Sequence, residues 1–248
     1  MQGDKFSIFT GKMKLNNEEI KSSTSLIVKN YMDEPEEAFL GKLAPNIQEL
    51  RKKTNELKTK YVELMNNPGW KQIEKKDNFA SYSMAGEEGL LYIKSEGIID
   101  CTPLEVAGFL NLQNLKTMFD KTFKKGSKLQ ELPNNMAIMH ERFNGKLIFS
   151  DRDFVFITVK YLNFNDGSIQ IIATEAPNIM QDEKGAVRGS IKIGGYLLIP
   201  DGEKTKAVYI VSTNLKGNIP NFIANMVAEN QGTIVSRLNE AIKKICKP

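Results

Sequence analysis

The last quarter of the chain contains a predicted strand followed by a long amphipathic helix, and this pair limits the folds that the rest can adopt. The run AVYIVST, from Ala207 to Thr213, is rich in β-branched and aromatic residues and predicts a strand. Gly217 and Pro220 follow, and proline suits the first turn of a helix. Apolar residues then recur three, four and seven apart: Ile219, Phe222, Ile223, Met226, Val227, Ile234, Leu238, Ile242 and Ile245. Such a stripe needs a cover, and a β-sheet is the simplest one.

A series of short strands is predicted before this pair. FASYSMA at 79–85 and LLYIKSEGII at 90–99 predict a hairpin, because a Gly-Glu-Glu-Gly turn separates two β-rich runs. Beyond the hairpin we expect short helices at 103–112 and 115–123, a basic loop at 124–128, and strands at 129–132, 136–143, 153–162, 168–175 and 187–199. Strands joined by short turns predict an antiparallel sheet of about nine strands.

Two of the predicted helices begin at a proline. Pro45 opens a segment in which apolar residues recur three and four apart, and Asn-Asn-Pro-Gly at 66–69 closes it. Thr102, Pro103 and Glu105 have the spacing of a capping box with proline in the first turn. The helix from Pro45 either packs against the outside of the domain or supplies the seam of a coiled-coil dimer.

The separation of helices from strands along the chain predicts an α+β fold. We expect a curved antiparallel sheet wrapped around the long C-terminal helix, with the helix from Pro45 packed outside. A cavity remains between sheet and helix unless large side chains fill it. Residues 1–44 are expected to be an extension that is partly ordered or docks elsewhere, in which SLIVKNYM at 25–32 is a short helix or a strand. Residues 45–248 are expected to form the domain.

Composition and charge argue against several classes of protein. The net charge of +4, from 34 basic and 30 acidic residues, is too small to indicate a nucleic-acid partner, although it is compatible with weak attraction to anionic membranes. Cys101 and Cys246 lack the number and spacing of a disulfide framework or a metal site, so we expect free thiols. The chain carries neither a signal peptide nor the roughly 20 apolar residues of a membrane span. These features predict a cytoplasmic protein.

Motifs for catalysis are weak in this sequence. His140 is the single histidine, and strand alternation places it on the face opposite to Glu141. No Cys-x-x-Cys, His-Glu-x-x-His or Gly-x-Ser-x-Gly motif occurs. KKGSK at 124–128 lacks the spacing of a phosphate loop, and its charges indicate a solvated turn or contact with a phospholipid headgroup. We therefore predict no catalytic residue, no metal and no cofactor.

Several segments together resemble the START domain family of lipid-transfer proteins. Those segments are Trp70, Glu96–Val106 (EGIIDCTPLEV), Phe119–Asp120, Asp151–Val159 (DRDFVFITV), Ala186–Ser190 (AVRGS) and Lys204–Pro220. The order of RDF, then VRG, then LKGxxP is fairly specific as a set, and the similarity runs over residues 45–246. The resemblance implies a helix-grip fold that encloses a tunnel for one lipid. Members of the family move or sense sterols, phospholipids or sphingolipids without converting them.

The resemblance also implies a set of ligand-binding residues. Those expected to line the tunnel are Met139, Glu141, Phe143, Phe154, Phe156, Thr158, Arg188, Tyr209, Phe222, Ile223, Met226, Val227 and Asn230. Sterol-carrying members pair the acidic residue at the position of Glu141 with an arginine, but Thr158 stands at the arginine's position here. Glu141 is thus expected to be protonated, to pair with another residue such as Arg142 or Arg188, or to face solvent on the outer side of its strand.

The segment Asn144–Ser150 matches the family's entrance loop by position. It contains a lysine followed by three apolar residues, Lys146, Leu147, Ile148 and Phe149. These residues either contact a membrane surface, with the lysine among the headgroups, or extend a strand and close the pocket.

The leading functional hypothesis is a monomeric lipid-binding and lipid-transfer protein that contacts membranes transiently. One alternative is a lipid-sensing module that regulates a protein partner. Another is an enzyme on the same fold, because a fold does not determine a function. An enzyme would need convergent titratable groups, whereas the expected pocket offers chiefly Glu141.

Overall fold

The structure, a computed structural model, describes most of the chain. The described residues are 18–31, 36–41, 43–145, 149–217, 219, 227 and 230–245. The helices are α2 (Glu18–Lys29), α3 (Glu36–Leu40), α4 (Pro45–Met65), α5 (Pro103–Asn111) and α7 (Ile234–Ile245), with the 3-10 turns η1 (Glu87–Gly89) and η2 (Gln113–Met118). The predicted capping box is confirmed at the start of α5, where Thr102 and Glu105 each accept a hydrogen bond from the other's backbone N–H.

A curved antiparallel sheet forms the body of the molecule. Its strands are β1 (Lys71–Lys76), β2 (Phe79–Ala85), β3 (Leu91–Ile99), β4 (Phe123–Leu132), β5 (Met136–Phe143), β6 (Asp151–Leu162), β7 (Ile169–Glu175), β9 (Ser190–Asp201) and β10 (Lys204–Asn214). Within the described residues their order is β1-β2-β3-β10-β9-β7-β6-β5-β4, and the short β8 (Ala186–Arg188) pairs with β6 in parallel. The predicted α+β fold and the hairpin β2–β3 are confirmed.

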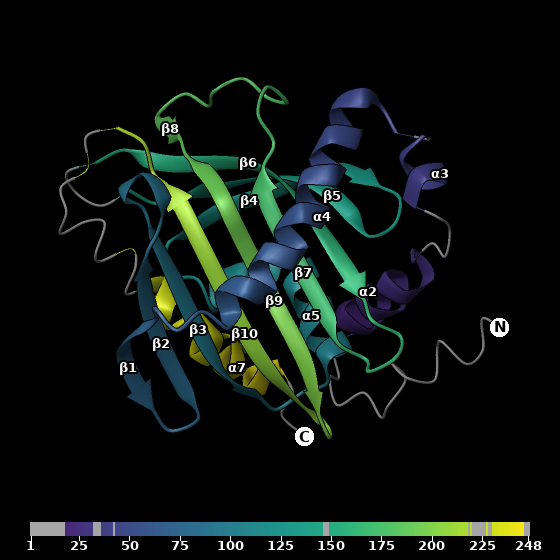
Figure 1. The fold of residues 1–248 in the computed structure, drawn as a ribbon, viewed down its shortest axis with the longest axis vertical. Helices are drawn as coiled ribbons and strands as arrows, with labels where there is room; N and C mark the ends of the chain where they lie inside the picture. The colour runs from purple at the N-terminus through teal and green to yellow at the C-terminus, as the bar shows by residue number, and fades with distance from the viewer. Residues whose placement is uncertain are drawn as a thin grey trace.

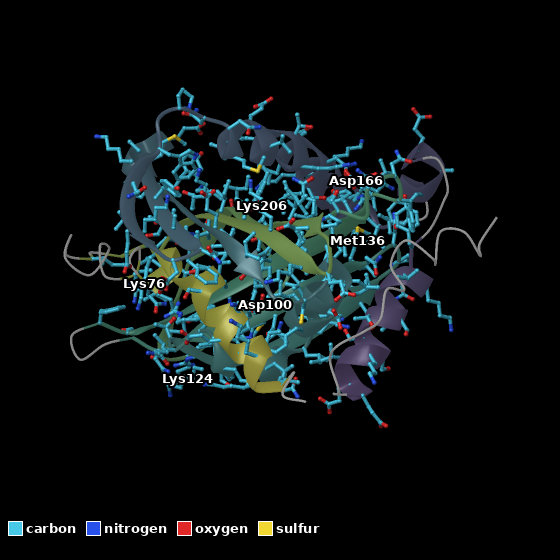
Figure 2. The ribbon with its side chains drawn as sticks, turned by 90° about the horizontal axis from the view of Figure 1, so that it is seen from below. Lys76, Asp100, Lys124, Met136, Asp166 and Lys206 are labelled. Carbon is cyan, nitrogen blue, oxygen red and sulfur yellow. The ribbon has the colours of Figure 1, made fainter. Side chains whose placement is uncertain are left out.

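Helices cover both faces of this sheet. In Figure 1, α4 crosses the face toward the viewer, while α7 and α5 lie behind the sheet. The view from below in Figure 2 separates these layers, with α4 above the sheet and α7 beneath it. Helix α2 packs on α5 through the buried side chains of Ile20 and Ile27. The sequence of segment 25–32 was compatible with either a helix or a strand, and the structure shows a helix as far as Lys29.

Alternation along β6 divides its side chains between the two faces of the sheet. Val155, Ile157 and Val159 point outward and pack with residues of α3 and α4. Phe154 and Phe156 point to the opposite, inner face, where they pack with Met139 of β5. This alternation sets which residues can meet a ligand under α7.

The outer face is tied to α4 by Tyr61. The side chain is fully buried, and its hydroxyl donates to the carbonyl oxygens of Gly195 (3.1 Å) and Val208 (2.7 Å) on neighbouring strands. A buried phenol needs such partners, because an unpaired hydroxyl inside a protein is costly. Burial also raises the pKa of Tyr61 well above its usual value, so the hydroxyl stays a donor.

Two secondary-structure predictions were wrong, and one strand was not predicted. Residues 124–128, expected to be a loop, belong to strand β4 at the edge of the sheet, where lysines extend into solvent. The expected helix at 115–123 is the shorter turn η2, and β4 already begins at Phe123. Strand β1 was not expected, since all six of its residues are exposed and show no apolar alternation. Edge strands are the places where the hydrophobic pattern is weakest.

The C-terminal helix is interrupted within the predicted stripe. Residues 230–232 are helical, Thr233 forms a turn, and α7 begins at Ile234. The Thr233 hydroxyl donates to the backbone oxygen of Asn230 (3.2 Å), a bond that competes with regular helix geometry. Gly232 packs closely on β2, because a Cβ there would lie 3.0 Å from that of Ser81. From Ile234 onward the predicted apolar stripe is buried, with Leu238 and Ile242 fully enclosed.

Candidate functional site

A cavity of about 230 Å³ lies between the inner face of the sheet and the helical segments beneath it. Strands β5, β6, β7, β9 and β10 supply one wall, and η2 together with residues around Ile234 supplies the other. Gly194 and Gly195 of β9 form part of this wall. A Cβ on Gly195 would lie 1.8 Å from the Ile171 carbonyl oxygen, and its φ of +149° is one that other residues rarely adopt. The close approach of β9 to β7 at this point therefore requires glycine at position 195.

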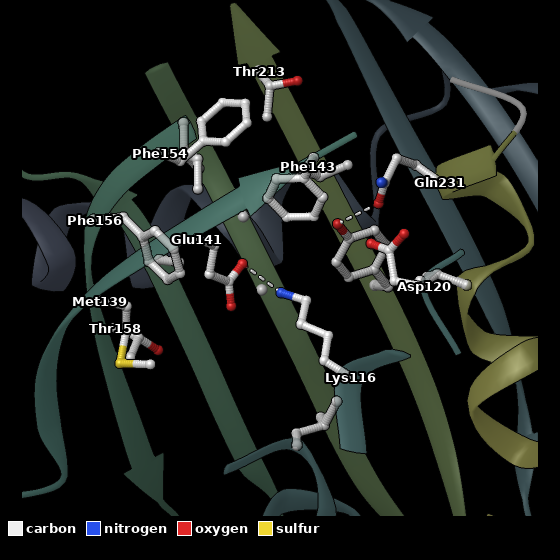
Figure 3. A pocket seen from close by; sticks show the side chains of 18 of the residues that line it. Lys116, Asp120, Met139, Glu141, Phe143, Phe154, Phe156, Thr158, Thr213 and Gln231 are labelled. Atoms are coloured by element: carbon white, nitrogen blue, oxygen red, sulfur yellow. Dashed lines mark hydrogen bonds and ion pairs between the residues drawn. The ribbon is translucent and has the colours of Figure 1, made fainter. Parts of the chain in front are cut away.

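Aromatic side chains make one part of the cavity apolar. Figure 3 shows Phe143, Phe154 and Phe156 pointing into it together with Met139. The rings of Phe143 and Phe154 meet edge to face, with centroids 5.6 Å apart. Such a surface favours hydrocarbon groups and offers them no hydrogen bond. The flexible thioether of Met139 can adjust to guests of different shape.

A buried ion pair crosses the cavity wall. The Glu141 carboxylate, 4% exposed, accepts a hydrogen bond of 2.5 Å from the Lys116 ammonium of η2 (Figure 3). The same ammonium lies 5.5 Å from the centre of the Phe143 ring. Glu141 therefore faces the cavity, and its partner is neither of the two arginines that the sequence suggested. Arg142 and Arg188 bind carboxylates on the opposite face of the sheet instead.

A second polar group lies beside the helical residues at 230–232. The Tyr209 hydroxyl donates to the side-chain oxygen of Gln231 at 2.9 Å, and the rings of Tyr209 and Tyr196 are 4.8 Å apart. Burial raises the pKa of both tyrosines far above the usual value, so both remain neutral donors. Asp120 also faces this part of the cavity, and its carboxylate accepts bonds from the backbone and hydroxyl of Thr122.

A buried lysine lies at the far end of β6 from Phe154. Lys160 is 8% exposed and lines the cavity on the same face as Phe154 and Thr158. Burial, together with the charge of nearby Lys128, lowers its pKa from 10.5 to about 8. Among the described residues, none forms an ion pair or side-chain hydrogen bond with the Lys160 ammonium. Lys160 lies six positions after Phe154, so the part of β6 that lines the cavity is about 20 Å long.

Most of the predicted ligand-binding residues in the described part of the chain line this cavity. They are Met139, Glu141, Phe143, Phe154, Phe156, Thr158, Tyr209 and Val227. Phe149 of the predicted membrane-contact loop lines it too. Six further residues lie outside the described residues: Lys146, Leu147, Ile148, Phe222, Ile223 and Met226.

Two predicted ligand-binding residues are turned away from the cavity. Arg188 donates to the Asp153 carboxylate at 2.8 and 3.0 Å on the outer face, because strand β8 joins the sheet at that side of β6. Asn230 accepts a bond of 2.5 Å from the Arg237 guanidinium, while its neighbour Gln231 takes the position beside the cavity. Neither Arg188 nor Asn230 is among the residues that line the cavity.

A titratable cluster occupies the outer face at His140. Its Nε2 atom lies 3.1 Å from the Asp153 carboxylate and 3.4 Å from that of Glu183, a grouping that could hold a cation. Arginines already neutralise these acids, since Arg188 binds Asp153 and Arg142 lies 3.0 Å from Glu183. The cluster thus acts as a buried ion network that fastens the segment before β8 to the sheet. His140 points away from the cavity, as strand alternation predicted.

Several polar residues that line the cavity were not predicted from the sequence, among them Lys116, Asp120, Lys160 and Gln231. A usable signal existed for Lys160, because alternation from Phe154 and Phe156 places it on the inner face. Lys116 gave no such signal, since η2 has no strand or helix periodicity and is brought to Glu141 only by the tertiary fold.

Within the described residues, none of the helices has the length and apolar character needed to cross a bilayer.

Comparison with known proteins gives one family and a shared fold. Residues 50–247 match the family model described as the START domain. Human StAR-related lipid transfer protein 5 superposes with a TM-score of 0.72 at 20% identity, over 80% of this chain and 98% of that one. Human STARD10 superposes with a TM-score of 0.66 at 16% identity, over 82% of this chain and 81% of that one. The STAR-related lipid transfer protein from Xanthomonas axonopodis superposes with a TM-score of 0.62 at 20% identity, over 71% of this chain and 99% of that one.

At these identities the likeness to solved structures establishes the fold alone. No curated protein sequence matches the chain. The family match, in contrast, spans about four fifths of the residues, including every strand of the sheet and helix α7. On that basis this chain belongs to the START domain family.

Proposed function

We propose that this protein binds one lipid in the cavity and transfers it between membranes without changing it chemically. The observation that carries the proposal is an apolar, aromatic cavity enclosed by the sheet and helical segments. Hydrocarbon removed from water is stabilised by about 0.8 kcal/mol for each CH₂ group, so such a cavity can compete with a bilayer for a lipid chain. Two structural neighbours are described as lipid transfer proteins, which supports the same function.

The polar groups of the cavity support binding rather than catalysis. The Glu141 carboxylate is engaged by Lys116, and burial raises the pKa of Tyr209, so this phenol does not become a phenolate that could act as a base. Among the described lining residues, none is a serine or cysteine beside a histidine. These groups can instead donate to or accept from the polar end of a lipid, which fixes its orientation in the cavity.

The entrance loop is proposed to contact the membrane during transfer. Phe149 joins that loop to the cavity, and the Arg152 guanidinium lies 5.3 Å from the centre of its ring. Lys146, Leu147 and Ile148 complete the predicted contact surface. An apolar residue next to a lysine suits the boundary between acyl chains and headgroups. The protein is proposed to act as a monomer in the cytoplasm, with residues 45–248 as the lipid-binding unit.

Ligand capacity is tested by filling the cavity. Protein purified from cells is analysed by native mass spectrometry and then offered fluorescent lipid in vesicles. Ala173→Trp places an indole in the cavity and should abolish both co-purified lipid and transfer. Lys206→Trp adds the same side chain on the exposed part of β10 and serves as the control. Full lipid loading of the Ala173→Trp protein would contradict the proposal.

Membrane contact is tested separately. Ile148→Asp should slow transfer between vesicles about tenfold while leaving lipid capacity intact, because a charge disfavours insertion into the membrane boundary. Ile73→Asp, at an exposed apolar residue on β1, is the matched control. Unchanged transfer by Ile148→Asp would remove the loop from the mechanism. Absence of transfer by the wild type, with a ligand-dependent change in oligomeric state, would favour a regulatory module.

A further inference from the structure

The most unusual group in the cavity is the ammonium of Lys160. Its side chain is more than nine-tenths buried, and it meets neither a carboxylate nor a hydrogen-bond acceptor among the described residues. Buried lysines are ordinarily paired, because removal of a charge from water is expensive without a partner. Burial, followed by the charge of Lys128, lowers the pKa of Lys160.

The charge of Glu131 favours the Lys160 ammonium, but burial and the charge of Lys128 disfavour it more strongly. Lys128 of β4 lines the cavity on the same face of the sheet as Lys160 and adds a second positive charge. It pairs at 3.2 Å with Glu131, whose side chain is 54% exposed. Thr158, two residues along β6, offers only a hydroxyl. With two cations, Lys160 and Lys128, and one carboxylate, Glu131, this end of the cavity carries a net positive charge.

The other cations that line the cavity are already engaged. Lys116 binds Glu141. Arg152, at the opposite end of β6, donates to the backbone oxygens of Ser150, Leu215 and Lys216 at 2.6, 2.7 and 3.2 Å. Lys160 differs from both because its hydrogen-bonding capacity is unused within the described structure. An anionic ligand group would gain most at Lys160.

We propose that Lys160, assisted by Lys128, binds the anionic end of the ligand, so that the cavity selects amphiphiles carrying a carboxylate or phosphate. This inference rests on the proposed lipid binding. The ammonium donates to the oxyanion at one end, while the hydrocarbon part extends along β6 toward Phe156 and Phe154. A volume of about 230 Å³ is below the roughly 300–1,000 Å³ of typical ligand pockets, which favours a single chain over a two-chain phospholipid.

Chemically matched probes test this assignment. Palmitate, the corresponding alcohol and the corresponding alkyl phosphate share one chain and differ only in the head. Their affinities are measured by displacement of a fluorescent lipid and by native mass spectrometry. We expect the wild type to bind palmitate and the alkyl phosphate at least about tenfold more tightly than the alcohol, because an ionised acceptor strengthens the hydrogen bond.

Substitutions identify the responsible residue. Lys160→Met should reduce the preference for the anionic probes to less than about twofold while retaining the alcohol, and Lys160→Arg should restore it. Lys206→Met, on the exposed side of β10, should leave the preference unchanged. Circular dichroism and the retained alcohol show that the Lys160→Met protein is folded.

Each contrary result has a distinct meaning. Equal wild-type affinity for acid and alcohol, or a preference that survives in Lys160→Met, would overturn the anion site and leave lipid binding intact. Uptake of none of the three probes by the wild type would overturn lipid binding and the anion site together. Displacement of palmitate, but not of the alcohol, by millimolar inorganic phosphate would show that the site serves a free anion and overturn its assignment to a lipid headgroup.

Discussion

Lys160 makes the stability of the protein depend on alkaline pH. Below about pH 8 its ammonium is charged in both the folded and the unfolded chain, and the folded state bears the cost of burying it. Between about pH 8 and 10.5 the folded state releases the proton while the unfolded chain keeps it. The unfolded chain then binds more protons, so the free energy of unfolding rises with pH across this window.

The size of the effect follows from the two pKa values. The difference between 10.5 and about 8 corresponds to roughly 3 kcal/mol, at about 1.4 kcal/mol for each tenfold change in proton affinity. Lys160→Met removes the charge and keeps an unbranched chain of similar length. At neutral pH this variant should therefore be about 3 kcal/mol more stable than the wild type, and the difference should shrink as the pH approaches 10.

Urea unfolding of delipidated protein, from about pH 7 to about pH 10, measures this difference. Lys94, whose pKa is lowered by burial, also makes the free energy of unfolding rise with pH. The buried tyrosines Tyr61, Tyr196 and Tyr209, whose pKa values are raised, make it fall only above pH 10. Both effects occur equally in the wild type and in Lys160→Met. Lys206→Met removes a charge that helps to lower the pKa of Lys94, so its profile should change only through Lys94 and should keep the rise caused by Lys160. Parallel profiles for the wild type and Lys160→Met would show that the Lys160 ammonium remains hydrated, and would refute the reasoning.

Three further changes have defined outcomes in the same unfolding assay. Lys116→Met leaves the Glu141 carboxylate buried without its partner and should cost about 3 kcal/mol, whereas the double variant with Glu141→Gln should recover most of this loss. Gly195→Ala should lower stability by more than about 3 kcal/mol, because the added methyl overlaps a backbone carbonyl, while Gly194→Ala costs far less. Tyr61→Phe should cost about 1–3 kcal/mol, since two buried carbonyls lose their donor.

The inner face of the sheet could be predicted from sequence because a strand obeys a simple rule. Alternation turned His140 away from Glu141, and the same rule accounts for Phe154, Phe156 and Thr158 sharing the inner face, although the family resemblance was what suggested them. The rule fails where a residue's position depends on a distant segment. Lys116 belongs to a short turn whose location is set by the packing of α5, so its pairing with Glu141 appears only after the chain has folded.

Edge strands escaped prediction for a different reason. β4 has eight residues between its buried ends, and its lysines obscure any apolar alternation, so it was interpreted as a loop followed by a shorter strand. β1 buries none of its six residues. Their strand structure comes from pairing with β5 and β2, and pairing of this kind leaves no pattern in the edge strand itself.

The edge strands β1 and β4 also affect how readily the protein aggregates at high concentration. β1 and β4 end an open sheet, so each carries backbone groups that another chain could pair with. Lys71, Lys75 and Lys76 lie on β1, and Lys124, Lys125 and Lys128 on β4. Two copies approaching edge to edge would therefore bring like charges together and desolvate them, which opposes growth of aggregates and amyloid-like ribbons. The lysines on both edge strands thus favour the single folded chain over edge-to-edge association.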